Sequence, residues 1–314
     1  MPQSRAMSMR YDVAIVGGGP AGLSASIFLA RYLHSVVLID SGDPRNWETR
    51  GINCYLGLPK VTPAELRQRG RDEARKYGVR LVDDCVDRAG MMSDEEFVLT
   101  THSGDEYVGR RLLLAIGLKD VWPDIPGLER AYGETAHVCP DCDGYEARDQ
   151  KTVVVGKGRK AVGMALYLTA WTRDVVICTN GEPPEMDLAE YCEKLDTLNI
   201  PVLTQKVQRL RVRERRIVSL ELEDGMELDA EKIFFAIGQY PADDLGAQLG
   251  CERDEGGHIV VDRVYHTSVR NVFAAGDIVS GSQLAIAAAS DVAIAAPAIH
   301  KSLVPAGRRL TTEA

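Results

Sequence analysis

The run Tyr11–Val16 leads directly into the turn Gly17-Gly18-Gly19-Pro20-Ala21-Gly22, and Leu23–Leu33 follows with the composition of a helix. A short apolar run rich in β-branched residues is typical of a buried strand. Glycines at this spacing permit a sharp turn, a close approach of the backbone to a phosphate, and close packing of helix on strand. A second apolar run, Ser35–Ile39, ends at Asp40. This segment therefore predicts a βαβ unit of the dinucleotide-binding kind.

Asp40 strengthens this interpretation by its position. It lies 18 residues beyond Gly22, where a carboxylate can hydrogen-bond the hydroxyls of a nucleotide ribose. In such a unit the backbone at Gly19 approaches the pyrophosphate, and the helix N-terminus supplies amide hydrogens. The alternative is a tight strand-to-helix turn that binds no ligand.

The same order of elements recurs later in the chain. The strand-like run Lys151–Val155 is followed by the turn Gly156-Lys157-Gly158-Arg159-Lys160-Ala161, then by helical Val162–Trp171 and the apolar run Asp174–Cys178. The chain thus contains two nucleotide-fold units about 140 residues apart, a duplication of architecture whose sequences have diverged. The second turn is the candidate for a second nucleotide site.

Two further segments are near-copies of each other: Arg111–Gly117 (RLLLAIG) and Lys232–Gly238 (KIFFAIG) each indicate a buried strand that closes one unit. After the second copy, Asn271–Asp277 (NVFAAGD) leads to an alanine-rich helix that begins near Gln283. A last strand that delivers its end to a helix suits a return to the first unit. We predict an α/β fold with two Rossmann-like dinucleotide-binding domains, the second inserted in the first. The predicted domains are residues 1–118 with 244–314, and residues 119–243.

The composition sets limits on the class of protein. A chain of 314 residues with 45% apolar and 26% charged residues suits two globular domains. No stretch approaches the roughly 20 apolar residues that span a bilayer, and Met1–Arg10 lacks the apolar segment of a signal peptide, so we expect a soluble, cytoplasmic protein that does not bind membranes. The net charge of −9 and the isoelectric point near 5.3 argue against nucleic acid as a partner.

Among the seven cysteines, only Cys139 and Cys142 have the two-residue separation that lets neighbouring thiols form a reducible ring. The alternatives are a pair of inert buried cysteines or half of a zinc site. The zinc alternative lacks a second cysteine pair, and His137 is the single nearby histidine, so we expect no metal. His137 itself is either a hydrogen-bonded turn residue or an acid–base group near the disulfide.

These motifs together resemble the low-molecular-weight thioredoxin reductases over nearly the whole chain. The resemblance rests on GGGPAG, on GINCYLG at Gly51–Gly57, on CPDCDG at Cys139–Gly144, and on AAGD with Gln283 six residues after Asp277. The position of the cysteine pair is the most informative feature. In glutathione-reductase-like enzymes the redox cysteines lie in the FAD domain, whereas here they precede the second glycine turn, as in thioredoxin reductases.

The resemblance implies a homodimer with FAD as the prosthetic group, and it assigns roles to individual residues. It implies that Cys142 faces the flavin, that Cys139 attacks or resolves the substrate disulfide, and that Asp143 moves the proton. A carboxyl group beside the flavin-facing cysteine can protonate the leaving sulfur. The expected FAD contacts are Gly17, Gly18, Gly19, Pro20, Ala21, Gly22, Asp40, Arg45, Asn53, Val86, Gly117, Asp277, Gln283 and Leu284. For Arg45 a surface ion pair is the alternative role.

The second glycine turn departs from the family pattern. Members that oxidise NADPH have Gly-Gly-Gly-Asp-Ser in this turn and a His-Arg-Arg cluster after the next strand, which clamps the 2′-phosphate. Here the turn reads Gly156-Lys157-Gly158-Arg159-Lys160, so that it carries three cations. The next strand ends at Cys178-Thr179-Asn180-Gly181. The three cations either face a pyrophosphate or belong to a charged surface. We expect an altered second site that holds NADPH, a second FAD or nothing.

Three electron paths follow from this departure. The enzyme takes hydride from NADPH, or it is independent of pyridine nucleotides and receives electrons from a small redox protein, or it oxidises a small dithiol and passes the electrons to oxygen. The altered turn favours the second path. The expected substrate is a thioredoxin-like protein or a small dithiol or disulfide. A flavin-binding redox sensor is the non-enzymatic alternative.

Overall fold

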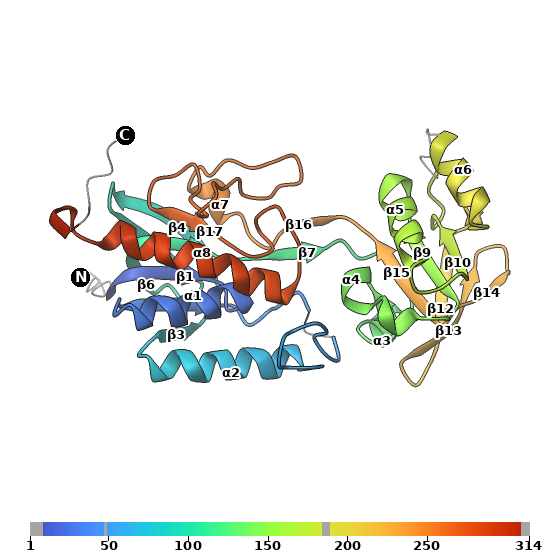
Figure 1. Ribbon diagram of the computed structural model, residues 1–314, viewed down its shortest axis with the longest axis horizontal. Coiled ribbons are helices and arrows are strands. Elements are labelled where there is room, and N and C mark those ends of the chain that lie inside the picture. The colour runs from blue at the N-terminus through green and yellow to red at the C-terminus, as the bar shows by residue number, and fades with distance from the viewer. Residues whose placement is uncertain (1–8, 47–48, 184–188, 309–314) are drawn as a thin grey trace, which may run out of the picture.

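The computed structural model describes residues 9–46, 49–183 and 189–308. The chain forms two bodies, joined where β7 (Leu118–Asp120) pairs antiparallel with β16 (Gln239–Pro241). The elements before β7 and after β16 make one body, and the elements between them make the other (Figure 1). The second unit is therefore inserted in the first, and the predicted fold class is confirmed. We propose that the domain boundaries lie at these two linking strands.

The first body is built on a seven-stranded sheet in the order β3-β2-β1-β6-β5-β4, and β17 also pairs with β6. The strands β1, β2, β3, β6 and β17 pair in parallel, whereas β4 and β5 extend the sheet antiparallel. The bounds are β1 (Met9–Val16), β2 (Val36–Asp40), β3 (Arg80–Asp83), β4 (Val86–Ser93), β5 (Glu96–Thr101), β6 (Glu106–Leu114) and β17 (Val272–Ala274). All residues of β2 are buried, as expected for a central parallel strand.

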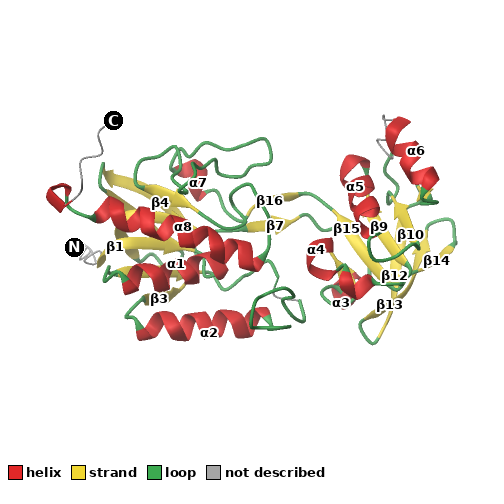
Figure 2. Cartoon of the chain, viewed as in Figure 1, coloured by secondary structure: helices red, strands yellow, loops and turns green. Residues whose placement is uncertain are grey.

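Helices cover the first sheet (Figure 2). They are α1 (Pro20–Arg31), α2 (Pro63–Lys76), α7 (Leu245–Gln248) and α8 (Ala285–Leu303). Alanines on α8 pack in one core with Ala21 and Ala25 of α1, because small side chains let the two helices approach closely. The helix α1 begins at Pro20, inside the glycine turn, where proline suits the first helical position. The observed helix therefore starts at Pro20, three residues before the start at Leu23 that the composition predicted.

The second body has a five-stranded parallel sheet in the order β11-β10-β9-β15-β8 and an antiparallel sheet of β12, β13 and β14. The strands are β8 (Ala136–His137), β9 (Thr152–Gly156), β10 (Val175–Cys178), β11 (Val202–Leu203), β12 (Val207–Arg213), β13 (Arg216–Leu222), β14 (Glu227–Asp229) and β15 (Lys232–Ala236). The helices are α3 (Leu128–Ala131), α4 (Pro140–Asp143), α5 (Gly158–Leu168) and α6 (Ala189–Thr197), with 3₁₀ turns η1 (Tyr145–Ala147) here and η2 (Ala306–Arg308) in the first body.

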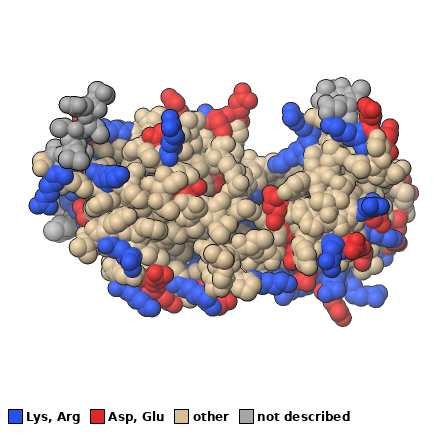
Figure 3. Space-filling view, in the orientation of Figure 1, with Lys and Arg blue, Asp and Glu red and all other residues tan. Residues whose placement is uncertain are grey.

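The charged surface agrees with the composition. Arg209 and Arg211 of the hairpin β12–β13 both pair with Glu221, so part of the positive charge of this hairpin is neutralised within its own sheet. On the face shown in Figure 3, basic and acidic side chains are interspersed over both bodies. In the described ranges no helix is long and apolar enough to cross a membrane. The same ranges contain no group of three or more His, Cys, Asp or Glu side chains arranged to hold a metal ion.

Candidate active site

The first glycine turn joins β1 to α1 at the carboxyl end of the parallel strands, where ligands bind in open α/β sheets. Gly17 has φ +102°, and a Cβ there would lie 2.2 Å from the carbonyl oxygen of Ala115. A Cβ on Gly22 would lie 1.8 Å from the carbonyl oxygen of Gly17. A Cβ on Gly19, in contrast, would meet no atom within 4 Å. Gly17 and Gly22 are therefore needed to close the turn, a Cβ on Gly18 would meet the side chain of Asp40, and Gly19 leaves open space in front of the helix N-terminus.

That open space belongs to a cavity of about 580 Å³, within the usual range of roughly 300–1,000 Å³ for ligand sites. Nearly all of the predicted FAD contacts line it: Gly17, Gly18, Gly19, Pro20, Ala21, Asp40, Arg45, Asn53, Gly117, Asp277, Gln283 and Leu284. Gly22 supports the turn from behind. Val86 is the exception, because its side chain is 5% exposed in the core of β4 and does not line the cavity. The cavity and its open cradle fit the pyrophosphate and ribityl parts of an FAD.

Asp40 is placed as predicted, at the end of β2, but its carboxylate is already engaged. Its Oδ1 accepts the backbone N–H of Gly18 at 3.1 Å. Its Oδ2 forms ion pairs with Arg67 and, at 3.3 Å, with Arg71 of α2. The two arginines are four residues apart, so they lie on one face of the helix. Asp40 thus presents a carboxylate whose charge is compensated, and Arg67 becomes a cavity residue that the sequence analysis missed.

Arg45 lies in the cavity, as expected, and its ion pairs are largely buried there rather than on the surface. Its guanidinium donates two hydrogen bonds of 2.8 Å to Asp120, whose side chain is 1% exposed, and pairs with Asp277 at 3.2 Å. It also donates to Gln283 at 2.7 Å. Gln239 closes the network, since it donates to Asp120 and accepts from Gln283. Through Arg45 and Gln239, this network connects the linking strands β7 and β16 to Asp277 and Gln283, two residues expected beside the flavin.

Burial dominates the electrostatics at Asp277. It raises the pKa of the Asp277 carboxyl above its usual value, although the positive charge of Arg45 opposes this. A group in this position takes up a proton more readily than an ordinary aspartate. Neither Asp120 nor Gln239 was predicted, because each lies on a linking strand far from Arg45 in sequence.

Cys139 and Cys142 are joined in a disulfide with their Cα atoms 5.3 Å apart. Cys139 caps the short helix α4, and its Sγ accepts the backbone N–H of Cys142 at 3.2 Å. The turn requires Gly144, because a Cβ there would meet the carbonyl oxygen of Pro140 at 2.6 Å and the ring of Trp171 at 2.7 Å. Both sulfur-bearing residues line the same cavity as the first glycine turn.

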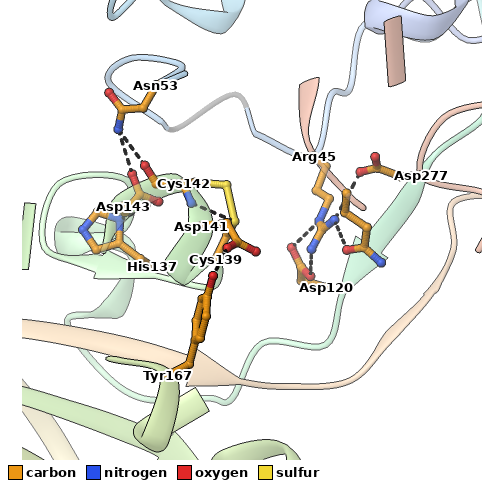
Figure 4. Close-up of a disulfide and its surroundings, with 11 residues drawn as sticks. Arg45, Asn53, Asp120, His137, Cys139, Asp141, Cys142, Asp143, Tyr167 and Asp277 are labelled. Carbon is orange, nitrogen blue, oxygen red and sulfur yellow. Dashed lines mark hydrogen bonds and ion pairs between the residues drawn. A yellow bond between two sulfur atoms is a disulfide. The ribbon is translucent and has the colours of Figure 1, made fainter. Parts of the chain in front are cut away.

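Asp143 is held on both sides. Its Oδ2 lies 3.3 Å from Nδ1 of His137, and its Oδ1 lies 3.5 Å from the amide nitrogen of Asn53 (Figure 4). Asn53 also donates to the carbonyl oxygen of Cys142 at 2.9 Å. Asn53 comes from the first body. Its hydrogen bonds to Cys142 and Asp143 therefore hold α4 of the second body against the predicted flavin site (Figure 4).

The second glycine turn has a different character. Lys157 pairs with Glu182 at 3.3 Å, and Lys160 donates to the carbonyl oxygen of Ile237, next to the linking strand β16. Loss of hydration lowers the pKa of the Lys160 ammonium. Of the three predicted cations, two are therefore directed at partners in the chain, and Arg159 is exposed. The pattern Gly156, Gly158 and Ala161 still forms the turn from β9 into α5.

The residues at the end of β10 are buried or hydrogen-bonded within the protein. Cys178 and Thr179 are buried, and Asn180 accepts the backbone N–H of Val207 through its side-chain oxygen at 2.9 Å. Neither arginine nor histidine occurs in the run Cys178–Gly181, where a 2′-phosphate would bind. These four residues therefore supply none of the cations that the family pattern has at this strand end.

Comparison with known proteins identifies the family. The model of the pyridine nucleotide-disulphide oxidoreductase family matches residues 11–291. The chain belongs to this family. It is 32% identical over 276 residues to thioredoxin reductase tcpT of Claviceps purpurea, covering 85% of this chain and 86% of that one. It is 27% identical to the thioredoxin reductase of Bacillus subtilis, covering 92% and 94%.

Solved structures extend the likeness to three dimensions. The crystal structure of HlmI matches with a TM-score of 0.88 at 33% identity, covering 96% of this chain and 94% of that one. As a pyridine nucleotide-disulphide oxidoreductase the protein is an enzyme, an FAD-dependent disulfide oxidoreductase similar to thioredoxin reductases. The resemblance inferred from the sequence is confirmed.

Proposed function

We propose that the protein moves two electrons between a bound FAD and a thiol–disulfide substrate through Cys139 and Cys142. One observation carries this proposal: the disulfide and the open glycine cradle line one cavity. A flavin bound there supplies two-electron chemistry, and the cysteine pair connects it to substrates outside the cavity. The redox sensor alternative needs no such connection, because its disulfide would never turn over.

The chain's own residues hold the reacting groups. The turn at Gly19 and the N-terminus of α1 offer backbone amides to a pyrophosphate, and Asp277 and Gln283 line the same cavity. After reduction, the N–H of Cys142 that points at Sγ of Cys139 favours a thiolate there, because hydrogen bonds to a charged form stabilise it. This supports Cys139 as the sulfur that attacks or is attacked by the substrate, with Cys142 toward the flavin.

We further propose that NADPH is not the ordinary electron donor. The run Cys178–Gly181 offers no cation to a 2′-phosphate, and the amide oxygen of Asn180 is occupied by Val207. The pair Lys157–Glu182 closes the turn only weakly, since exposed ion pairs contribute about 0–1 kcal/mol. We therefore attribute poor NADPH use to the missing cations at the 2′-phosphate, and not to blockage of the turn by the Lys157–Glu182 ion pair. The donor is then a small redox protein, or the substrate is a dithiol whose electrons pass to oxygen, and a second FAD is a candidate ligand for this site.

The second candidate is an NADPH-dependent thioredoxin reductase. It is favoured by the relatives, since the proteins of Claviceps purpurea and Bacillus subtilis are both called thioredoxin reductases. In either case we propose a cytoplasmic homodimer that acts on a thioredoxin-like protein or on a small dithiol or disulfide.

Anaerobic titration separates these candidates. The flavins released per chain are counted first, and the protein is then titrated with NADPH, with NADH and with a small dithiol while flavin absorbance is followed. We expect the dithiol to bleach the flavin. We expect NADPH to act about a hundredfold more slowly than in an enzyme that has the 2′-phosphate clamp, because the loss of such charge-assisted hydrogen bonds costs roughly 3 kcal/mol. Rapid bleaching by NADPH at one flavin per chain would establish the second candidate. Readmitting air then tests oxygen as acceptor.

A further inference from the structure

A buried histidine beside the redox disulfide has no part in the function proposed above. His137 ends β8, and its side chain is 6% exposed. Its Nδ1 faces Oδ2 of Asp143, the residue that follows Cys142, and the Asp143 side chain is 16% exposed. In Figure 4 the imidazole and the carboxylate point at each other on one side of the disulfide helix.

The other nitrogen of His137 distinguishes it from an ordinary core histidine. Its Nε2 is buried and has no hydrogen-bond partner in the described chain, while the ring packs at 5.4 Å against Phe234. Buried polar side-chain atoms are hydrogen-bonded in the large majority of cases. An unpartnered one costs about 1–3 kcal/mol. A purely structural role would be served better by an apolar ring, so the contact with Asp143 is the feature to explain.

Charged groups from the neighbouring elements surround the pair. Lys232 of β15 is 8% exposed, donates to the carbonyl oxygen of Glu134, and interacts electrostatically with Asp143 and with Glu146 of η1. Burial lowers the pKa of Lys232, and the nearby charge of Arg216 acts in the same direction. One carboxylate oxygen of Glu146 is itself buried without a hydrogen-bond partner.

The remaining charge is directed elsewhere, since the carboxylate of Glu134 pairs with Arg50 at 3.1 Å. The charged side chains that remain around the His137–Asp143 pair are Lys232, Glu146 and Arg216. With a proton on the imidazole, the His137–Asp143 pair is neutral. Without that proton, the pair carries one negative charge next to the sulfur.

We propose that His137 is a positioning residue that shares one proton with Asp143, and that this pair, rather than Asp143 alone, sets the charge beside Cys142 and delivers its proton. The proposal rests on the proposed function. When a substrate thiolate attacks Sγ of Cys139, a new S–S bond forms and the Cys139–Cys142 bond breaks. The electron pair leaves on Sγ of Cys142, and the shared proton moves to that sulfur. A second substrate thiolate then displaces Cys139, so that the dithiol is oxidised and the cysteine pair is reduced.

The thiolate of Cys142 reports this directly, without turnover. In the protein reduced by a phosphine, iodoacetamide alkylates thiolates, and mass spectrometry follows Cys139 and Cys142 separately between pH 5 and 9. The variant His137→Asn keeps an amide donor near the position of Nδ1 but cannot be protonated. Its unneutralised Asp143 opposes the thiolate, so we expect alkylation of Cys142 at pH 6–7 to fall about tenfold, the effect of one pKa unit.

A charge rescue separates this role from a structural one. Replacing Asp143 by Asn in the His137→Asn background removes the negative charge, and alkylation of Cys142 is expected to return to within about threefold of wild type, since like-charge repulsion is then gone. A double variant as slow as His137→Asn would show that the effect does not act through Asp143 and would overturn the proposal. The same conclusion follows if His137→Asn has the pH profile of the wild type.

The chain offers a matched control. His266 pairs with Asp262 at 3.0 Å, but its side chain is 42% exposed and lies outside the cavity. His266→Asn is expected to leave alkylation of both cysteines unchanged. Circular dichroism and flavin content verify folding, and His137→Gln replaces the first variant if that one does not fold. Failure of the proposed function is seen separately, as wild-type flavin that no dithiol can reduce, whereas normal flavin reduction with an unchanged pH profile in His137→Asn overturns this inference alone.

Discussion

Two glycines of the first turn, three residues apart, are expected to respond oppositely to the same small substitution. Gly19 has φ −76° and ψ −173°, which alanine adopts without strain, and its Cβ would meet no protein atom within 4 Å. Alanine loses about 0.5–1 kcal/mol relative to glycine at a helix N-cap. It gains a similar amount, about 0.4–1 kcal/mol, by restricting the unfolded chain. The stability of Gly19→Ala in the absence of cofactor should therefore equal that of the wild type.

The affinity of Gly19→Ala for FAD, in contrast, should be lower than that of the wild type. The new methyl group occupies the space in front of the amides of α1, so the pyrophosphate must move away from one or two of them. Hydrogen bonds to a charged group contribute about 1.5–3 kcal/mol each. The dissociation constant of FAD should rise by about tenfold to a hundredfold for each bond that is lost.

The neighbouring variant behaves differently because its clash is with the backbone. In Gly22→Ala the Cβ would lie 1.8 Å from the carbonyl oxygen of Gly17, so the turn must open, at a cost of about 1–3 kcal/mol. Melting of the apoproteins by circular dichroism, FAD counted per chain, and FAD titration by fluorescence are the assays. Gly163→Ala is the control, because its Cβ faces open space on α5 and should affect neither FAD content nor affinity. Normal FAD affinity in Gly19→Ala would refute the placement of the pyrophosphate.

Three further outcomes are expected. In Cys142→Ser, FAD content should be normal but reduction of the flavin by a small dithiol should fall to background, measured by flavin absorbance under anaerobic conditions. Arg45→Met leaves Asp120 buried without its cation and should lower the free energy of unfolding in urea by about 3 kcal/mol, whereas the paired change with Asp120→Asn should recover most of it. Burial raises the pKa of Asp243 to about 6, so the folded state holds this proton more tightly than the unfolded chain. Its stabilisation, of order 2 kcal/mol, is complete below about pH 4 and is lost as the pH rises through 6; urea melts of Asp243→Asn should lack that decline.

The elements that the sequence predicted well are those whose signals are local. The strand at Tyr11–Val16, the glycine turn and the end of β2 at Asp40 were placed from a few adjacent residues, because strand burial, turn geometry and helix start are all decided within one βαβ unit. The second unit followed from the same syntax. The disulfide was predicted equally well, since the separation of Cys139 and Cys142 alone permits the bond.

The elements that it missed depend on residues far apart in the chain. Arg67 and Arg71 lie on one face of α2, a pattern visible in the sequence, but only the fold brings that face to Asp40. Arg45 likewise finds Asp120 across 75 residues. The long side chain of an arginine can pair with any nearby carboxylate. The sequence therefore indicates that these arginines form ion pairs, but not with which aspartate or glutamate.

The second glycine turn shows the same limit. Its cations were expected either to face a pyrophosphate or to belong to a charged surface. All three are exposed, as the second alternative expects, and Lys157 and Lys160 are bonded to Glu182 and to the carbonyl oxygen of Ile237. Glu182 lies in the loop after β10 and gave no signal of its own in the sequence. Val86 packs in the core of the first body and does not line the cavity, so its contact with FAD stays a prediction.

The central claim is that electrons pass between bound FAD and the disulfide Cys139–Cys142, and an anaerobic reductive titration tests it most directly. Dithionite is added stepwise to the wild type and to Cys142→Ser while flavin absorbance and free thiols are measured. Since flavin and disulfide each take two electrons, we predict that the wild type consumes about twice the dithionite per flavin that Cys142→Ser consumes, with thiols appearing as the flavin equilibrates. Equal consumption by both proteins, with the wild-type disulfide intact beside a fully reduced flavin, would contradict the account.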